Sequence, residues 1–381
     1  MSNRTYTKDE LAAALESTGI RNFTDIVRYG SGHINDTFKV ETIGGERYIL
    51  QRVNTDIFDA ALLKANVLRV TSHLKAKGIP SLEVVGYENP WRVFRFLEGY
   101  TSIDLVTKPA EAELAASSFA KFQNDLADLP APRLGEIIPK FHDTVDRLRL
   151  LDEAAARDVA GRKANVAKEL AFVDAHRAEA SRVLDLMKTG DIPERITHND
   201  TKINNVMVPG AGCLVPGAGY GSETPITSHP APSTLHQAQS TNHQAPSVVI
   251  DLDTTMPGSA LYDFGDMVRT STAAAAEDEK DLSKVYSKKE YFEALVKGYL
   301  SQAKFLNETE LANLAFSGRL ITFTIGIRFL TDYLAGDTYF RTAYPDHNLD
   351  RCHTQFKMIE SMEAQAAEYE AIVHRYMRST D

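Results

Sequence analysis

The residues best suited to chemistry lie in the stretch 196–206, which contains the pattern His-x-Asp-x-x-x-x-Asn. Asp200 follows His198 by two residues and precedes Asn205 by five. This is the spacing of a phosphoryl-transfer loop, in which the Asp accepts the proton of the attacking hydroxyl and the Asn binds magnesium. The positive charge of Lys202 can offset the charge of the transferring group. The pattern therefore predicts Asp200 and Lys202 as catalytic residues and Asn205 as a metal ligand.

A second group of acidic residues follows a long interruption. Residues 248–250 form an apolar, β-branched run that ends in Asp251, with Asp253 two residues further on. Such a run predicts a buried strand that presents carboxylates at its end. Magnesium takes hard oxygen ligands, commonly one or two carboxylates together with phosphate oxygens, so Asn205, Asp251 and Asp253 are the predicted metal residues. The alternative is structural, because Asp and Asn in short polar segments often form turns and helix caps.

The composition limits the class of protein. The chain has 381 residues, of which 43% are hydrophobic, enough for two regions with ordinary cores. Its net charge of -10 argues against a surface for nucleic acid or for an anionic membrane. We find no secretion signal and no apolar run long enough to span a bilayer, so we expect a soluble, cytoplasmic protein. Cys213 and Cys352 are too few for a disulfide framework. The oligomeric state is left open.

The N-terminal part of the chain has the pattern of a small sheet. A short amphipathic helix comes first, and β-rich segments separated by glycines follow it. The pair Gly44-Gly45 predicts a hairpin turn between two of these segments. The expected helix covers residues 8–17, and the expected strands cover 23–29, 34–43, 47–53 and 91–99.

Several N-terminal residues are predicted to bind ATP. Gly30, Gly32 and His33 lie in a glycine-containing turn between two strands, which could place backbone amides over phosphates. The alternative is an ordinary turn. Backbone groups near Leu97, close to where the last of these strands ends, could receive the adenine ring.

Arg52 is the best available cation on the third strand, where kinases place a phosphate-binding Lys. Alternation sends Arg52 to one face of the sheet and Gln51 to the other. In kinases a Glu on the following helix holds that Lys, but the expected helix 58–77 contains no Glu. Asp59, Asn66 or His73 could substitute for it, and a solvent-facing Arg52 is the alternative.

Beyond Pro109 the composition becomes helical. We therefore predict an α+β fold of the bilobal, protein kinase-like type, with a small β-rich N-lobe and a larger, mainly helical C-lobe. The nucleotide-binding lobe is expected over residues 1–97, and the catalytic and substrate lobe over 98–381. The expected helices of the second lobe cover 110–129, 165–189, 291–305, 308–334 and 353–377.

A segment over residues 209–247 interrupts the catalytic region. It is rich in Gly, Pro, Ser, Thr, Gln and His and has few charges, which is the composition of a flexible insertion. We interpret it as an enlarged hairpin loop. His229, His236 and His243 recur at intervals of seven, but without rigid flanks or cysteines the spacing does not predict a metal site.

The tripeptide Asp263-Phe264-Gly265 matches the metal-binding motif of protein kinases. We interpret the match as accidental, because the metal-binding Asp should end a buried strand, and the apolar strand here leads into Asp251. Asp263 follows a turn and precedes a helix, so helix capping is the expected role.

The last predicted site lies near the end of the helix 308–334. Arg328, Asp332 and Tyr333, with Asp337 and Tyr339 just beyond, could hydrogen-bond a sugar or another polyhydroxylated substrate. The alternative is an ion pair between Arg328 and Asp332 on the surface of the helix.

Taken together, the motifs resemble those of the aminoglycoside phosphotransferase and choline kinase-like superfamily, and within it most closely the N-acetylhexosamine 1-kinases. The catalytic loop and the Asp251 segment carry the superfamily likeness, and the first and last stretches carry the likeness to the sugar kinases. The matching stretches are 32–38, 48–52, 198–205, 250–254, 262–266 and 328–334.

The resemblance implies an ATP- and Mg²⁺-dependent enzyme of carbohydrate metabolism that transfers the γ-phosphoryl group to the anomeric hydroxyl of an N-acetylhexosamine. It implies Asp200 as the base, which also contacts the acceptor, and Asn205 and Asp251 as magnesium ligands. The long insertion and the missing helix Glu depart from the family pattern.

Other functions remain open. The acceptor could be choline, ethanolamine, homoserine, methylthioribose or an aminoglycoside; choline would require an aromatic cage and an aminoglycoside an acidic pocket. The chain could also be a non-catalytic, nucleotide-binding protein with a kinase fold, or a helical scaffold whose motifs are accidental.

Overall fold

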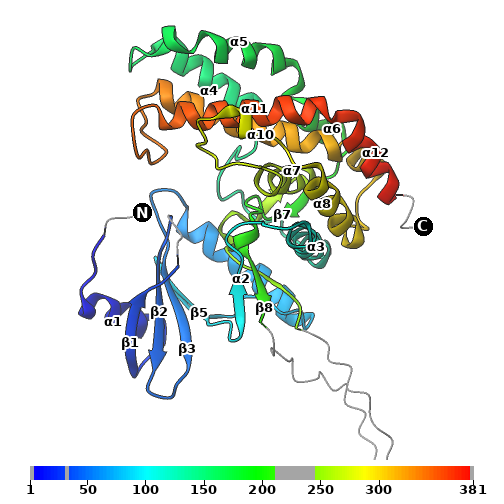
Figure 1. Ribbon diagram of the computed structural model, residues 1–381. Coiled ribbons are helices and arrows are strands. Elements are labelled where there is room, and N and C mark those ends of the chain that lie inside the picture. The colour runs from blue at the N-terminus through cyan, green and yellow to red at the C-terminus, as the bar shows by residue number, and fades with distance from the viewer. Residues whose placement is uncertain (1–3, 31–33, 211–244, 378–381) are drawn as a thin grey trace, which may run out of the picture.

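The computed structural model describes residues 4–30, 34–210 and 245–377. A small antiparallel sheet near the N-terminus lies below a larger helical region in the view of Figure 1. The predicted α+β fold with a β-rich first part and a helical second part is confirmed.

The N-terminal sheet has the strand order β1-β2-β3-β5-β4, and every neighbouring pair is antiparallel. Helix α1 (Lys8–Ser17) covers its outer face, where Leu15, Leu50 and Val93 share one apolar cluster. Helix α2 (Ala60–Ala76) connects β3 to β4. The strands are β1 (Phe23–Arg28), β2 (Asp36–Thr42), β3 (Arg47–Arg52), β4 (Val84–Glu88) and β5 (Trp91–Arg95).

The C-terminal region packs around α10 (Leu314–Leu334), which contacts α4, α7 and α11. α10 is long and apolar enough to cross a membrane, contrary to our expectation that no such run exists, but 72% of its apolar window is buried inside the protein. It is therefore a core helix. The other helices of this region are α3 (Pro109–Leu126), α4 (Thr144–Arg157), α5 (Ala167–His176), α6 (Arg182–Thr189), α7 (Ala260–Ser271), α8 (Lys289–Gln302), α9 (Glu308–Ala312), α11 (His347–Ala364) and α12 (Ala366–Met377).

Three of the helices expected in this region are each divided. The stretch 165–189 contains α5 and α6 with a 3-10 turn between them, 308–334 contains α9 and α10, and 353–377 contains the end of α11 followed by α12. Capping residues that interrupt a periodic apolar pattern are a weak signal, which is why the sequence predicted continuous helices.

Short strands hold the catalytic segment in place. β7 (Arg195–Thr197) pairs with β10 (Met256–Gly258), and β8 (Val206–Pro209) lies between β6 (Tyr100–Ser102) and β9 (Val248–Val249). β8 and β9 are antiparallel, as the enlarged hairpin requires. Cys213 and the three histidines of the insertion lie outside the described residues.

Candidate active site

A buried carboxylate fixes the start of the catalytic loop. The backbone N–H groups of His198 and Asn199 donate to Asp263 on α7, at 2.8 and 2.7 Å, and the Gln123 amide donates to it at 2.6 Å. Burial raises the pKa of Asp263 to about 6. The predicted helix-capping role is wrong, because Ser259 is the N-cap of α7. Asp263 instead positions the loop that carries Asp200.

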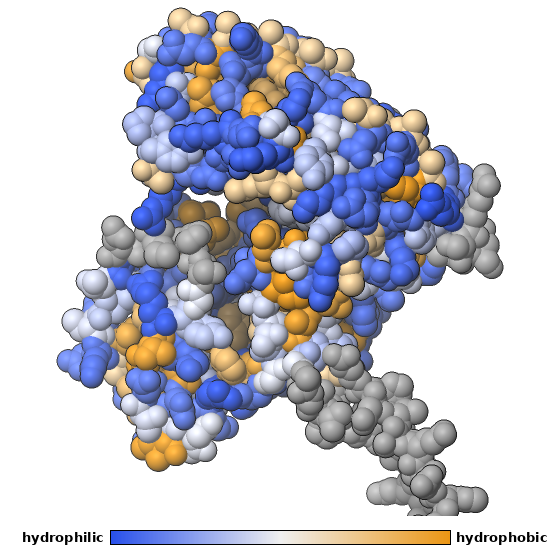
Figure 2. Space-filling model, in the orientation of Figure 1, coloured by the Kyte–Doolittle hydropathy of each residue, from blue (hydrophilic) through white to orange (hydrophobic). Residues whose placement is uncertain are grey.

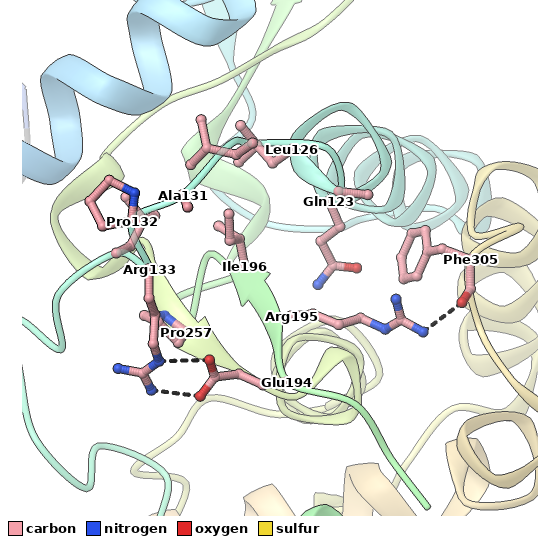
Figure 3. Close-up of a pocket in the computed structure, with 13 residues that line it drawn as sticks. Gln123, Leu126, Ala131, Pro132, Arg133, Glu194, Arg195, Ile196, Pro257 and Phe305 are labelled. Carbon is pink, nitrogen blue, oxygen red and sulfur yellow. Dashed lines mark hydrogen bonds and ion pairs between the residues drawn. The ribbon is translucent and has the colours of Figure 1, made fainter. Parts of the chain in front are cut away.

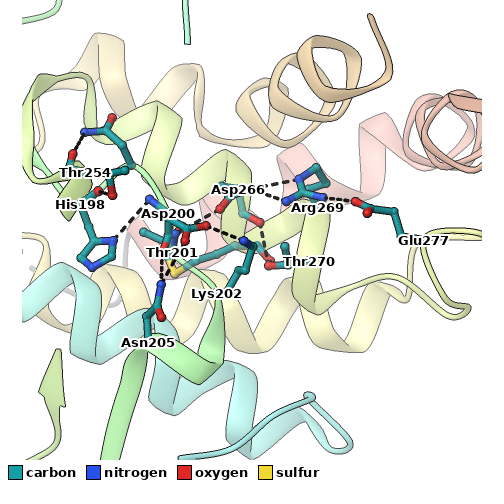
Figure 4. Close-up of polar contacts among 12 residues, drawn as sticks. His198, Asp200, Thr201, Lys202, Asn205, Thr254, Asp266, Arg269, Thr270 and Glu277 are labelled. Carbon is teal, nitrogen blue, oxygen red and sulfur yellow. Dashed lines mark hydrogen bonds and ion pairs between the residues drawn. The ribbon is translucent and has the colours of Figure 1, made fainter. Parts of the chain in front are cut away.

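Asp200 forms a close ion pair inside this loop (Figure 4). The Lys202 ammonium lies 2.8 Å from its carboxylate, and the Asn205 amide donates to its carbonyl at 2.9 Å and to its carboxylate at 3.2 Å. Burial is the largest effect and would raise the pKa of Asp200, but the charge and hydrogen bond of Lys202, together with the charges of His198 and Arg269, outweigh it, and the pKa is lowered. Asp200 is therefore an ionised group that can accept a proton, and Lys202 keeps it so.

A second ion-pair network continues from the same loop. The N–H of Thr201 donates to Asp266 at 3.1 Å, and Asp266 pairs with Arg269 at 2.9 Å. Arg269 also pairs with Glu277 at 3.1 Å. These contacts, which Figure 4 shows beside Lys202, tie the loop to α7.

Asp251 lies at the end of β9, in the left-handed backbone region with φ 59°. The N–H of Ile250 donates to the Asn205 carbonyl at 2.9 Å, so the predicted metal residues of the two segments are brought together. The Asp251 side chain is exposed to solvent, but the protein atoms that surround it reduce its solvation, and this effect, followed by the charges of Asp253 and Asp200, raises its pKa to about 7. Such a group gains from a cation that neutralises it.

A cavity of about 480 Å³ opens beside these residues, and Figure 2 shows the surface hollowed between the two regions. Asn205 and Asp251 line it from one side. Among the residues predicted to bind the nucleotide, Gly30 and Leu97 also line it, whereas Gly32 and His33 lie outside the described residues. Its walls include Tyr29, Thr37, Ile49, Gln51, Leu82, Arg92, Phe94, Tyr100 and Met207.

The expectation for Arg52 is corrected by the structure. Leu50 is fully buried beneath α1, so alternation turns Arg52 to that outer side and Gln51 into the cavity. The buried cation in the cavity wall is Arg92 of β5, whose Nε donates to the side-chain oxygen (Oε1) of Gln51 at 2.9 Å. A neighbouring strand, not the third strand itself, supplies this charge.

The proposed substitutes for the missing helix Glu make other contacts. Asp59 caps α2, Asn66 donates to the Gly135 carbonyl at 2.8 Å, and His73 pairs with Asp128 at 2.9 Å. None of these three side chains holds Arg52.

Asp253, the third predicted metal residue, is occupied by protein groups. One carboxylate oxygen lies 2.6 Å from Nη2 of Arg92, and the other accepts a hydrogen bond from the Asn35 amide at 2.6 Å. Asp253 therefore serves as the counter-ion of a buried Arg, which leaves Asp251 as the more open carboxylate.

The predicted acceptor residues do not act as one cluster. Asp332 and Tyr333 are buried; the Asp332 carboxylate accepts from the N–H groups of Tyr339 and Phe340 at 2.7 and 2.9 Å. In the described chain Arg328 forms no ion pair with Asp332; its guanidinium lies over aromatic rings. We therefore retain Arg328 and set Asp332 and Tyr333 aside. The rings near Arg328 belong to Phe141, Tyr339 and Phe340, at 5.6, 5.7 and 5.4 Å.

A smaller cavity, of about 190 Å³, is lined in part by Arg195 and Ile196 of β7 (Figure 3). Its charged groups are compensated: Arg133 pairs with Glu194 at 2.5 Å, and Arg195 pairs at 2.6 Å with Glu310, which is fully buried. Gln123 links this cavity to Asp263. None of the predicted site residues within the described ranges lines it.

The residues that the sequence missed are Arg92, Gln51, Asn35, Asp263 and Asp266. Arg92 and Gln51 are register partners on the neighbouring strands β5 and β3. The sequence reveals this polar pair only when the strand order is already known. Asp263 offers no comparable signal, because the two backbone N–H groups that it binds lie 64 and 65 residues away along the chain.

The sheet, the helical region and the loop between β7 and β8 define a phosphotransferase with a protein kinase-like fold. Residues 25–217, about half of the chain, match the model of the phosphotransferase enzyme family, and the chain belongs to that family.

Solved structures share the fold at low sequence identity. An ethanolamine kinase from Plasmodium vivax has a TM-score of 0.55 and 15% identity, covering 93% of this chain and 91% of that chain. Amicoumacin kinase hAmiN, solved with AMP-PNP, Ca²⁺ and Ami, has a TM-score of 0.57 and 11% identity, covering 92% and 93%. A choline kinase from Cryptosporidium parvum Iowa II has a TM-score of 0.54 and 14% identity, covering 91% of both chains.

Proposed function

We propose that this protein transfers the γ-phosphoryl group of ATP to a hydroxyl of a small molecule, with Asp200 as the base. The observation that carries this proposal is the meeting of an ionised Asp200 with Asn205 and Asp251 beside a cavity of about 480 Å³. Asp200 orients the acceptor hydroxyl and takes its proton, and Lys202 stabilises the ionised carboxylate. Most of the acceleration in such reactions comes from positioning and charge neutralisation.

Asn205 and Asp251 would hold Mg²⁺. The fit rests on the donors, an amide and a carboxylate that both offer hard oxygen ligands. The surrounding protein atoms and neighbouring carboxylates raise the pKa of Asp251 to about 7. No group of three His, Cys, Asp or Glu residues suited to a metal occurs in the described ranges, so the further ligands would be oxygens of phosphates and water. When bound, the ion neutralises charge on the phosphoryl oxygens.

The nucleotide would occupy the cavity, with adenine near the backbone of Leu97 and phosphates toward Gly30, in the lobe that we assign to residues 1–97. Gly32 and His33 remain predicted phosphate contacts. The catalytic and acceptor-binding lobe would then be 98–381.

We propose an N-acetylhexosamine as the acceptor, phosphorylated at its anomeric hydroxyl. The motif resemblance supports this choice, and so does the charge near the loop. The charges of Arg147 and Arg269 act on Arg328. The charge of Asp200 in turn acts on Arg269. Burial, opposed by Tyr339 and reinforced by these cations, lowers the pKa of Arg328. A positive group on this side disfavours cationic acceptors such as choline or an aminoglycoside and allows hydrogen bonds to a neutral sugar.

The test is ATP consumption with Mg²⁺ across N-acetylglucosamine, N-acetylgalactosamine, galactose, choline, homoserine, methylthioribose and kanamycin, with Asp200→Asn as the control. We expect turnover of the acetylated hexosamines that the variant loses. Turnover of a different acceptor would replace the substrate and keep the loop assignment. Absence of turnover with every acceptor, despite stabilisation by ATP, would favour the non-catalytic alternative.

A further inference from the structure

Arg92 is a fully buried cation in the wall of the nucleotide-sized cavity. It lies on β5, and its side chain is 2% exposed. Its guanidinium lies 5.1 Å from the centre of the Phe94 ring, and its Nε donates to Gln51 at 2.9 Å. These contacts fix the plane of the guanidinium, because each constrains a different edge or face.

The counter-ion of Arg92 comes from the other region of the molecule. Asp253 pairs with Nη2 at 2.6 Å and accepts from the Asn35 amide at 2.6 Å. The carbonyl oxygen of the Asn35 side chain accepts from the N–H of Asn54 at 3.0 Å. Asp253 therefore connects three parts of the sheet. It binds Asn35, which lies just before β2 and contacts Asn54 just after β3, and it pairs with Arg92 of β5.

Part of the guanidinium remains unused. Among the described residues Nη1 is buried and makes no hydrogen bond of ordinary geometry, and neither does the nearby hydroxyl of Tyr87, although the two side chains interact electrostatically. A buried N–H group without an acceptor is costly, so a ligand oxygen at this position would be stabilising. Arg92 also interacts electrostatically with Asp251. A guanidinium suits phosphate oxygens, which accept charge-assisted hydrogen bonds.

We propose that Arg92, oriented by Asp253 and Gln51, is the cation that binds the phosphates of the nucleotide. The inference rests on the proposed binding of ATP and assigns a residue that the proposed function does not need. Arg92 takes the place of the phosphate-binding Lys of protein kinases, and Asp253 takes the place of the Glu that holds this Lys. The cation lies on β5 and not on β3, and the acid follows β9 and does not lie on a helix.

The experiment measures binding of ADP and of adenosine by calorimetry, in the presence of EDTA so that metal binding does not contribute. We expect Arg92→Gln to weaken ADP binding about 10- to 100-fold, the range for one lost charged hydrogen bond, and to leave adenosine binding unchanged. Arg28→Gln is the matched control. Arg28 pairs with Asp36 at 3.0 Å and lies 5.3 Å from the Phe38 ring, and it does not line the cavity. This control variant should bind both ligands as the wild type does.

Arg92→Gln leaves Asp253 buried without a counter-ion, and this could prevent folding. The double variant Arg92→Gln/Asp253→Asn removes both charges and keeps similar shapes. If Arg92 binds phosphates, the double variant is still about 10-fold or more weaker for ADP. If Arg92 only neutralises Asp253, the double variant regains wild-type affinity, which overturns the inference.

The wild-type protein separates this inference from the proposed function. If the wild type binds ADP and the double variant binds it equally well, only the role of Arg92 is refuted and the proposed function stands. Failure of the wild type to bind ADP or ATP removes both.

Discussion

Asp200 and Asp251 lie in neighbouring segments of the same site, yet their surroundings shift their pKa values in opposite directions. The pKa of Asp200 is lowered, because Lys202, His198 and Arg269 together outweigh burial. The pKa of Asp251 is raised to about 7 by the surrounding protein atoms and by two carboxylates. The chain supplies a cation to the first carboxylate. The second forms no ion pair among the described residues, because the guanidinium of Arg92 is paired with Asp253. Under the proposed function, the first acid accepts a proton and the second binds a metal ion.

The largest expected effect comes from neutralising each acid in turn. Asp200→Asn and Asp251→Asn should each reduce kcat by about 10³-fold or more, since both remove charges that act on the reacting groups. They should differ in binding. Asp200→Asn keeps the affinity for Mg²⁺ and ATP together, whereas Asp251→Asn loses the Mg²⁺-dependent part of that affinity. Calorimetry with and without Mg²⁺ measures the difference, and equal losses in the two variants would erase the contrast.

A smaller effect is expected when the internal cation is removed. In Lys202→Met, burial of Asp200 is no longer opposed by the ammonium, so the pKa of Asp200 rises. Because only the ionised carboxylate accepts a proton, activity is lost as the pH falls through this higher pKa. We expect kcat to fall about 10-fold or more at neutral pH, with the acidic limb of the pH profile displaced to higher pH. An unmoved acidic limb would show that Lys202 does not set the ionisation of Asp200.

The smallest expected effect is on stability without nucleotide. Mg²⁺ should raise the Tm of the wild type by a few degrees, because binding to the folded state alone stabilises it. The increase should persist in Asp200→Asn and disappear in Asp251→Asn. Differential scanning fluorimetry over a Mg²⁺ titration, with NaCl at equal ionic strength as the control, measures it. An increase retained in Asp251→Asn would place the ion elsewhere.

The sequence predicted the features that depend on neighbours along the chain. The loop from His198 to Asn205 and the strand that ends in Asp251 carry fixed spacings and local apolar patterns, so their positions could be inferred. The same holds for the α+β fold, because strand and helix periodicities are local.

The features that the sequence did not predict depend on packing between distant segments. Alternation separated Arg52 from Gln51 correctly, but only the burial of Leu50 under α1 decides which of the two faces the cavity. Asp263 was assigned to helix capping from its neighbours, whereas its partners, His198 and Asn199, lie on a distant strand end. The pairing of Arg92 with Asp253 joins the two regions, and no local pattern indicates it.

The strands beside the insertion explain how the chain tolerates its length. Val206 is the register partner of Val249, and the N–H of Ile250 donates to Asn205, so the two acidic segments are held together by their own hydrogen bonds. The spatial relation between Asn205 and Asp251 therefore does not depend on the number of residues that connect them. For loops in general, doubling the length costs only about 0.6 kcal/mol in closure entropy. A change in the length of the connecting sequence therefore need not move Asn205 away from Asp251.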